Sequence, residues 1–253
     1  MDALILAGGK DTNSLENNHK LNNKALLMIN HVPMIEYVVD ALNQAREIED
    51  IVVVGPQLEL IPHIGEKVSK IIDSTDSIIQ NIKIGLDNIK NNHRIMVLTS
   101  DIPLVTGKMI DGFIKKCQEQ EAFLYYPYIS KEIILKRYPK TIRSYANLKE
   151  GTFCGGNMVI LSSLLFNENK SLLDEVFQKR KDIKKYATVL GIKFIIKYLF
   201  KCLTIKEIED RAAKLVGYPV KGIMVSDPEM MIDLDKLSDY ELILKVLNKS
   251  KNS

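Results

Sequence analysis

The chain has 253 residues, of which 46% are hydrophobic, and its formal net charge at pH 7 is +3. This is enough apolar material for one large α/β domain, and a charge so near neutrality argues against nucleic acid as the main partner. The three cysteines are far apart and form no C-x-x-C pair, so we predict neither a disulfide framework nor a zinc knuckle. This cysteine pattern favours a reduced, cytoplasmic setting. The longest late apolar stretch, 192–203, is too short and too often broken by lysines to span a bilayer, so we expect no membrane partner.

The first apolar run, from Asp2 to Ala7, is typical of a buried strand, and Gly8, Gly9 and Lys10 follow it at once. Two glycines directly after a strand indicate a tight turn or a backbone that something approaches closely. Successive N–H groups in such a turn can form a concavity for anions. A second cation, Lys24, follows a long polar loop. We therefore predict that the segment from Gly8 to Lys24 surrounds the phosphates of a nucleotide.

Between this loop and residue 120, helical and strand patterns alternate. Apolar residues recur at helical spacing over 34–44, 77–89 and 106–118, and they form short buried runs over 51–54, 68–72 and 94–99. Pro33 is predicted to open the first of these helices and Thr106 to cap the third. The alternation predicts a doubly wound, mostly parallel sheet with helices on both of its faces.

After residue 120 the pattern changes. Strands are predicted over 123–129, 157–161 and 221–225, a polar, tyrosine-rich link follows the first of them, and helices are predicted over 172–215 and 239–247. Thr204 and Glu207 have the spacing of a capping box. The lysines at 193, 197 and 201 recur every four residues, which predicts one charged stripe on an otherwise buried helix.

Three acids are candidate metal ligands. One follows a strand of the predicted parallel sheet, and the other two lie between the last predicted strand and the last predicted helix. Asp101 follows the strand 94–99, and ligands of open α/β sheets bind at the carboxyl ends of the strands. Asp233 and Asp235 precede the last helix, and their spacing on an extended segment points both side chains the same way. A hard cation such as Mg²⁺ takes one or two carboxylates and leaves its other positions to water and phosphate oxygens. The same residues also fit a helix cap or turn at Asp101 and an acidic surface turn at 233–235.

Other nucleotide-binding and catalytic motifs are missing from the sequence. The glycines at 8 and 9 do not belong to G-x-x-x-x-G-K-[ST] or to G-x-G-x-x-G, which disfavours a P-loop NTPase and a dinucleotide-binding Rossmann unit. No G-x-S-x-G elbow occurs, and the four histidines lack metal-ligand spacing.

Five stretches, in this order, resemble the MobA-like nucleotidyltransferases, the branch of the glycosyltransferase-A-like Rossmann fold that includes molybdenum-cofactor guanylyltransferases. They are L-I-L-A-G-G-K, N-K-A-L-L-M-I-N-H-V-P-M-I-E-Y-V-V-D-A-L, V-L-T-S-D-I-P-L, G-G-N and I-D-L-D-K-L-S-D-Y-E-L. The resemblance covers residues 2–160 and returns at 220–247. It implies a three-layer α/β/α Rossmann-like sheet of the nucleotide-diphospho-sugar transferase type. It also implies a single nucleotidyltransferase domain over 1–253, with an NTP-binding half (1–120) and an acceptor half (121–247) that includes a helical insert (171–216).

The resemblance also implies roles for single residues. The loop that holds the NTP corresponds to Leu6, Ala7, Gly8 and Gly9, and its base pocket corresponds to Ser77 and Asn81. The acceptor side corresponds to Gly156 and Asn157, and Lys24 corresponds to a lysine that contacts phosphates. The Mg²⁺ ligands correspond to Asp101 and Asp233, with Asp235 as the alternative to Asp233. One feature departs from the pattern. Family members usually carry an arginine, a small residue and a glycine in the first loop, which here reads D-T-N-S-L-E-N-N-H-K-L-N-N. Either one phosphate-binding cation is missing, or Lys10 or Lys20 replaces it, and arginine and lysine are not equivalent at such a site.

The expected activity is a Mg²⁺-dependent nucleotidyl transfer that moves an NMP from an NTP to a phosphorylated small-molecule acceptor and releases pyrophosphate. Two alternatives stay open: a non-catalytic nucleotide sensor, which the missing arginine suggests, and a glycosyltransferase that uses a nucleotide sugar. The glycosyltransferase would show a D-x-D pair after a central strand, whereas Asp101 is followed by Ile102 and Pro103. The helical insert is expected either to cover the acceptor site or to form the surface of a homodimer.

Overall fold

The structure is a computed structural model, and it describes residues 1–9, 23–90, 93–179 and 191–250 of the chain. Within these residues, nine strands form one mixed sheet in the order β5-β4-β1-β6-β10-β7-β9-β8, and β11 pairs with β7 beside that path. The strands of this sheet are β1 (Asp2–Leu6), β4 (Ile51–Val54), β5 (Lys70–Ile72), β6 (Arg94–Thr99), β7 (Leu124–Ser130), β8 (Ala146–Leu148), β9 (Gly151–Gly155), β10 (Met158–Ser162) and β11 (Val220–Met224). A separate hairpin consists of β2 (Met28–Ile29) and β3 (Val32–Pro33).

The first four strands in this order, β5, β4, β1 and β6, are all parallel, so their carboxyl ends meet at one edge. Leu6 pairs with Thr99 in this register, which places the end of β1 beside the end of β6. β10 then runs antiparallel to both β6 and β7. The predicted parallel half of the sheet is confirmed. After residue 120 the sheet becomes mixed, because β9 and β10 run against β7, whereas β11 runs parallel to it.

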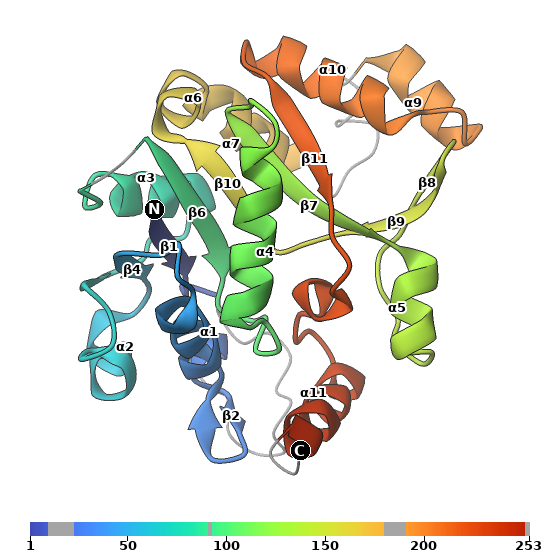
Figure 1. Cartoon of the computed structure of the whole chain (residues 1–253). Helices are drawn as coiled ribbons and strands as arrows, with labels where there is room; N and C mark the ends of the chain where they lie inside the picture. The colour runs from blue at the N-terminus through green and yellow to red at the C-terminus, as the bar shows by residue number, and fades with distance from the viewer. Residues whose placement is uncertain (10–22, 91–92, 180–190, 251–253) are drawn as a thin grey trace.

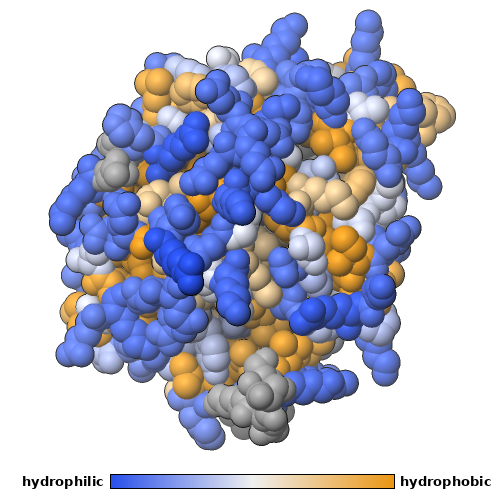
Figure 2. All heavy atoms as spheres, in the orientation of Figure 1, coloured by the Kyte–Doolittle hydropathy of each residue, from blue (hydrophilic) through white to orange (hydrophobic). Residues whose placement is uncertain are grey.

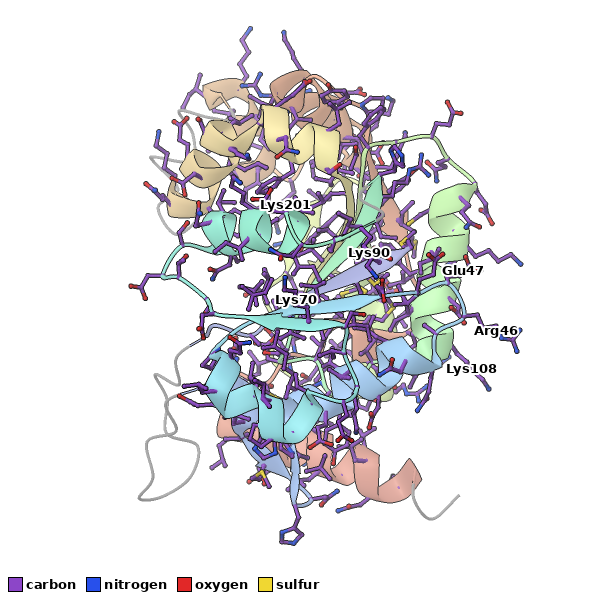
Figure 3. All side chains as sticks on the ribbon, turned by 90° about the vertical axis from the view of Figure 1, so that its left-hand side faces the viewer. Arg46, Glu47, Lys70, Lys90, Lys108 and Lys201 are labelled. Carbon is purple, nitrogen blue, oxygen red and sulfur yellow. The ribbon has the colours of Figure 1, made fainter. Side chains whose placement is uncertain are left out.

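Helices cover both faces of the sheet, which gives the three predicted layers (Figure 1). They are α1 (Met34–Gln44), α2 (Gln57–Ile64), α3 (Ile78–Leu86), α4 (Gly107–Gln118), α5 (Lys131–Arg137), α6 (Ser163–Glu168), α7 (Lys170–Lys179), α9 (Ile192–Leu199), α10 (Ile205–Val216) and α11 (Leu237–Ser250), with the 3-10 turns η1 (Lys24–Leu26) and η2 (Pro228–Met231). In Figure 3, α3 lies above the edge strand that carries Lys70, and α1 and α2 lie below it.

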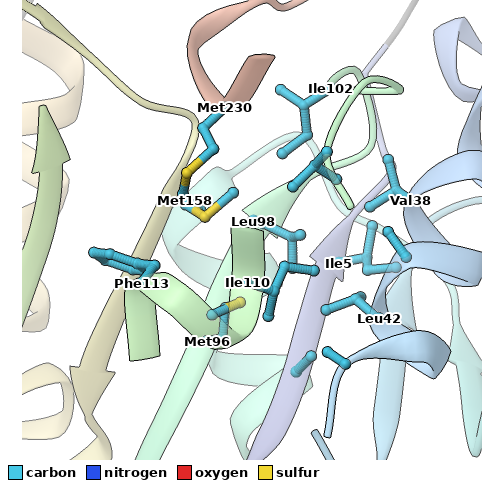
Figure 4. Close-up of a cluster of buried hydrophobic side chains, with 14 of the residues drawn as sticks. Ile5, Val38, Leu42, Met96, Leu98, Ile102, Ile110, Phe113, Met158 and Met230 are labelled. Carbon is cyan, nitrogen blue, oxygen red and sulfur yellow. The ribbon is translucent and has the colours of Figure 1, made fainter. Parts of the chain in front are cut away.

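The alternation of side chains along β1 explains why one strand serves two cores. Ala3, Ile5 and Ala7 pack into the core formed with α1, α2 and α4, part of which Figure 4 shows, whereas Leu4 packs against α3 on the other face. All four side chains are fully buried. Burying a side chain the size of leucine contributes about 1.5–3 kcal/mol, so β1 is fixed from both sides.

A third cluster joins the segment that follows the first loop to the C-terminal part of the chain. Leu27, Ile29 and Met34 pack against Ile232, Leu234 and α11. In Figure 1, β2 and α11 lie below the sheet. Ile232 and Leu234 are both completely buried. Because side chains alternate along an extended segment, this burial turns the intervening and following acids, Asp233 and Asp235, to the other side.

Some features differ from the sequence-based expectations. The helix α2, which contains Pro62, was not predicted, and the polar, tyrosine-rich link holds α5, β8 and β9. The expectation of an otherwise buried helix at 192–203 is wrong, because no residue of α9 is buried and Ile192, Leu199 and Phe200 are more than 60% exposed. The near face is mainly hydrophilic, with small hydrophobic areas that include the upper right, where α9 and α10 lie (Figure 2). Among the described helices, none is long and apolar enough to cross a membrane.

Candidate active site

Asp101 lies two residues beyond β6, at the edge where the parallel strands end. Its carboxylate accepts a hydrogen bond from the Thr99 hydroxyl at 2.5 Å. Its backbone carbonyl accepts one from the amide of Leu234 at 2.9 Å, so the C-terminal segment is fastened directly to the end of β6. This bond joins residues that are 133 positions apart. It places Asp233 and Asp235, the neighbours of Leu234, at the edge of the sheet.

The structure brings the three predicted carboxylates together. One oxygen each of Asp101, Asp233 and Asp235 lies within 4.8 Å of the other two. Three carboxylate oxygens gathered in this way are a candidate site for a hard divalent cation. The crowding of negative charge is visible at Asp233, whose pKa is raised above its ordinary value by burial and then by Asp235, although Arg143 opposes the shift.

Lys24 extends its ammonium group between two of these acids. Nζ donates to Oδ2 of Asp101 and to Oδ1 of Asp235, each at 2.7 Å. Burial by itself would lower the pKa of Lys24, but the two carboxylates outweigh it and raise that pKa above its ordinary value. Lys24 is therefore a fully protonated counter-ion of the acidic group.

The backbone of Lys24 is tied to the end of β1. Its amide donates to the carbonyl of Gly9 at 3.1 Å, and the Asn23 side chain donates to the carbonyl of Ala7 at 2.7 Å. Asn23 also caps η1 by accepting from the amide of Ala25. The sequence reasoning missed Asn23, although a polar residue directly before an apolar run is the signal of such a cap.

Gly8 contacts the turn that precedes α3. A side-chain carbon at position 8 would come within 2.7 Å of the Ser74 side chain, so only glycine fits this close approach. Asn81 is 7% exposed and holds the same turn, because its side chain accepts from the amide of Thr75 at 2.7 Å and donates to the Thr75 carbonyl at 3.0 Å. Ser77 caps α3. A base pocket beside Ser77 and Asn81 stays a prediction, and Lys10 and Lys20 lie outside the described residues.

Gly156 and Asn157 lie between β9 and β10, next to the end of β6. The carbonyl of Asn157 accepts from the amide of Thr99 at 3.1 Å. Nearby, burial raises the pKa of the Cys154 thiol to about 11, with Arg143 opposing the shift. This thiol is neutral at physiological pH and provides no thiolate nucleophile beside the acids.

Arg143 completes the site, and no pattern in the sequence singled it out. Its guanidinium donates to the Asp233 carboxylate at 2.5 Å and to the Asp239 carboxylate at 2.6 Å. The side chains of Arg143 and Asp239 are only 6% and 5% exposed. Asp239 in turn accepts hydrogen bonds from the amides of Asp235 and Lys236. Arg143 therefore supports the acidic segment 233–236 through both carboxylates that it binds.

A surface hollow of about 900 Å³ lies away from these residues, between the end of α1 and the start of α4. It is lined by Arg46, Glu47 and Lys108, among others, and Figure 3 shows these side chains on the outer surface. None of the acids described above lines it. The size of this hollow alone does not identify it as a catalytic site. The carboxylates and the lysine that converge at the sheet edge make that edge the candidate active site.

A sheet edge with a diglycine turn, a lysine and three carboxylates defines an α/β protein of the nucleotidyltransferase type. The chain belongs to the family described as the MobA-like NTP transferase domain, whose model matches residues 3–187. Its members are nucleotidyltransferases, so the chain belongs to a family of enzymes. The resemblance found in the sequence is thereby confirmed.

Solved structures agree with this assignment. The chain is similar to a hypothetical transferase from Thermus thermophilus, with 31% identity, a TM-score of 0.84, and coverage of 94% of this chain and 98% of that one. It shares its fold with a nucleotidyl transferase from Methanothermobacter (14% identity, TM-score 0.61, 98% of each chain covered). The same holds for CMP:2-keto-3-deoxy-manno-octonic acid synthetase complexed with CTP (11% identity, TM-score 0.64, 98% of each chain covered). No curated protein matches the sequence of this chain.

Proposed function

We propose that this chain is a Mg²⁺-dependent nucleotidyltransferase that moves an NMP from an NTP to the phosphate of a phosphorylated small molecule. The observation that carries the proposal is the convergence of Asp101, Asp233 and Asp235 at the end of β6, beside Lys24 and the diglycine turn. The CTP bound to one of the fold neighbours supports an NTP as the donor. We further propose that the chain works as one domain, with residues 1–120 serving the NTP and 121–247 the acceptor.

In the proposed reaction, an oxygen of the acceptor phosphate forms a bond to the α-phosphorus of the NTP. The bond between that phosphorus and the oxygen bridging to the β-phosphate breaks, and pyrophosphate leaves with the electron pair. Such a transfer depends on positioning and on charge neutralisation rather than on a covalent nucleophile. A divalent cation held by the three carboxylates would neutralise charge on the α-phosphate oxygens.

The chain's own residues supply the remaining parts. We assign the backbone from Leu6 to Gly9 to the sugar and phosphates of the NTP, since Gly8 and Gly9 add no side chain between that backbone and a ligand. Lys24 carries a protonated ammonium group at the same edge, and we assign it to the phosphates. Gly156 and Asn157 are assigned to the acceptor.

The test is pyrophosphate release from each of the four NTPs, with a panel of sugar phosphates as acceptors, in Mg²⁺ and in EDTA. Asp101→Asn is expected to lower the rate about 100-fold or more, because one electrostatic contact to the transition state is worth on the order of 3 kcal/mol. Its backbone bond to Leu234 does not involve the carboxylate, so the thermal unfolding midpoint should stay close to that of the wild type.

Asp111→Asn is the matched control, since Asp111 is an acid on α4 that lines the distant hollow. It should leave the rate within about twofold of the wild type, as expected for a surface substitution. An Asp101→Asn variant with undiminished Mg²⁺-dependent release would refute the assignment. Nucleotide binding without release would favour the sensor, and turnover of a nucleotide sugar without any NTP would favour the glycosyltransferase.

A further inference from the structure

Lys24 holds two of the three carboxylates that are assigned to the cation. Its ammonium nitrogen lies 2.7 Å from both Asp101 Oδ2 and Asp235 Oδ1. Mg²⁺ bonds oxygen at about 2.0–2.1 Å. The carboxylates that hold the ammonium group are thus the ones that would hold the metal ion, so the lysine and a divalent cation would compete for them.

Arg143 and Lys24, two positive side chains that the structure describes at this site, differ in burial and in the bonds that hold them. Arg143 is almost fully buried and is fixed by Asp233 and Asp239 together. The Lys24 side chain is 21% exposed, and only its terminal nitrogen holds it to the acids. Its backbone is fastened to Gly9 and packed through Ala25, which is 1% exposed. The fold therefore fixes the backbone of Lys24, whereas its ammonium group is held by the two carboxylates.

We propose that Lys24 is a displaceable internal cation, an inference that rests on the proposed function. Before substrates bind, its ammonium neutralises Asp101 and Asp235 and keeps the acids assembled. When a divalent ion arrives with a nucleotide, the lysine gives up these carboxylates and bonds the incoming phosphates instead. A cation therefore neutralises the acids both without and with the nucleotide: the lysine before binding and the divalent ion afterwards. The phosphates of the nucleotide become the new partner of the lysine.

A thermodynamic coupling follows from this exchange. The phosphates stabilise the lysine away from the acids, so a nucleotide should strengthen divalent-cation binding, and the cation must strengthen nucleotide binding by the same factor. Without a nucleotide the divalent ion competes with Lys24 and binds weakly. Removing the ammonium group should remove this competition.

The experiment is a titration with Mn²⁺ followed by electron paramagnetic resonance, without nucleotide, on the folded full-length chain. Lys24→Gln is expected to bind Mn²⁺ on the order of tenfold more tightly than the wild type, equivalent to ~1.4 kcal/mol. Lys24→Arg, which keeps the charge, should bind it as weakly as the wild type. In the presence of α,β-methylene analogues of the four NTPs, wild-type affinity should rise, and that of Lys24→Gln should rise much less.

Lys67→Gln is the matched control. Lys67 also bridges two carboxylates, Glu36 at 3.1 Å and Asp40 at 2.9 Å, but it lies outside the acidic group at the sheet edge. It changes the net charge equally and should leave Mn²⁺ affinity unchanged. If Lys24→Gln binds Mn²⁺ no more tightly than the wild type, the exchange is wrong even when the wild type releases pyrophosphate. If the wild type binds no Mn²⁺ with any analogue, both the exchange and the metal site of the proposed function fail.

Discussion

At the scale of single residues, Arg143 shows how a buried charge can support a group of acids. It lies behind Asp233 and bonds the carboxylate of Asp239, which holds the amides of Asp235 and Lys236. The arginine therefore joins the link before β8 to the start of α11. We regard it as a positioning residue for the acidic segment.

Replacing Arg143 tests this support. Arg143→Met leaves the nearly buried Asp239 carboxylate without its cation, and breaking a buried pair in this way costs about 3 kcal/mol of unfolding free energy. Lys206→Met is the control, because it removes an ion pair with Asp210 whose two side chains are 70% and 60% exposed, and it should change stability little. Urea denaturation measures both, and equal effects of the two substitutions would contradict a supporting role for Arg143.

The sequence identified residues with a local signal and missed those without one. Asp101 follows a strand, and Lys24 follows the loop after the diglycine turn, so position along the chain made them candidates and the family resemblance gave them roles. Arg143 lies in a polar link with no period, and its partners are 90 and 96 positions away. Only the tertiary structure shows such long-range pairings.

At the scale of elements, the helices and strands with a clear apolar period were predicted well. The bounds of β6 and α1 match the predicted ranges, and Thr106 caps α4 as expected. Pro62 concealed α2, because proline usually interrupts a helix, although here it lies near the end of a short one. α9 was predicted to be buried because its composition is apolar, but composition cannot show whether a neighbouring element covers a helix.

The contact between α3 and β1 provides a prediction at this scale. A methyl group at Gly85 would overlap the fully buried side chain of Leu4, whereas one at Gly112 of α4 would meet nothing within 4 Å. Both changes gain about 0.5–1 kcal/mol of helix propensity, but overpacking at Leu4 costs about 1–3 kcal/mol. Gly85→Ala should therefore lower the thermal unfolding midpoint and Gly112→Ala should raise it. A rise in both would show that β1 and α3 are packed less tightly than the structure indicates.

At the scale of the whole molecule, the fold assembles the site by packing the segment 27–34 against the C-terminal segment 232–247. Leu27 and the hairpin residue Ile29 pack against α11, and the bond from Leu234 to Asp101 fastens the C-terminal segment to the central sheet. This arrangement explains why a cluster built from residues 101, 233 and 235 can lie beside a lysine at position 24.

The measurement that tests the account most directly is an anomalous difference map from crystals soaked in Mn²⁺ with an α,β-methylene NTP analogue. We expect one strong peak among the carboxylates of Asp101, Asp233 and Asp235, beside an α-phosphate oxygen, with the Lys24 nitrogen moved from the acids to the phosphates. A bound analogue with its manganese peak elsewhere, or with Lys24 still bridging Asp101 and Asp235, would contradict the account.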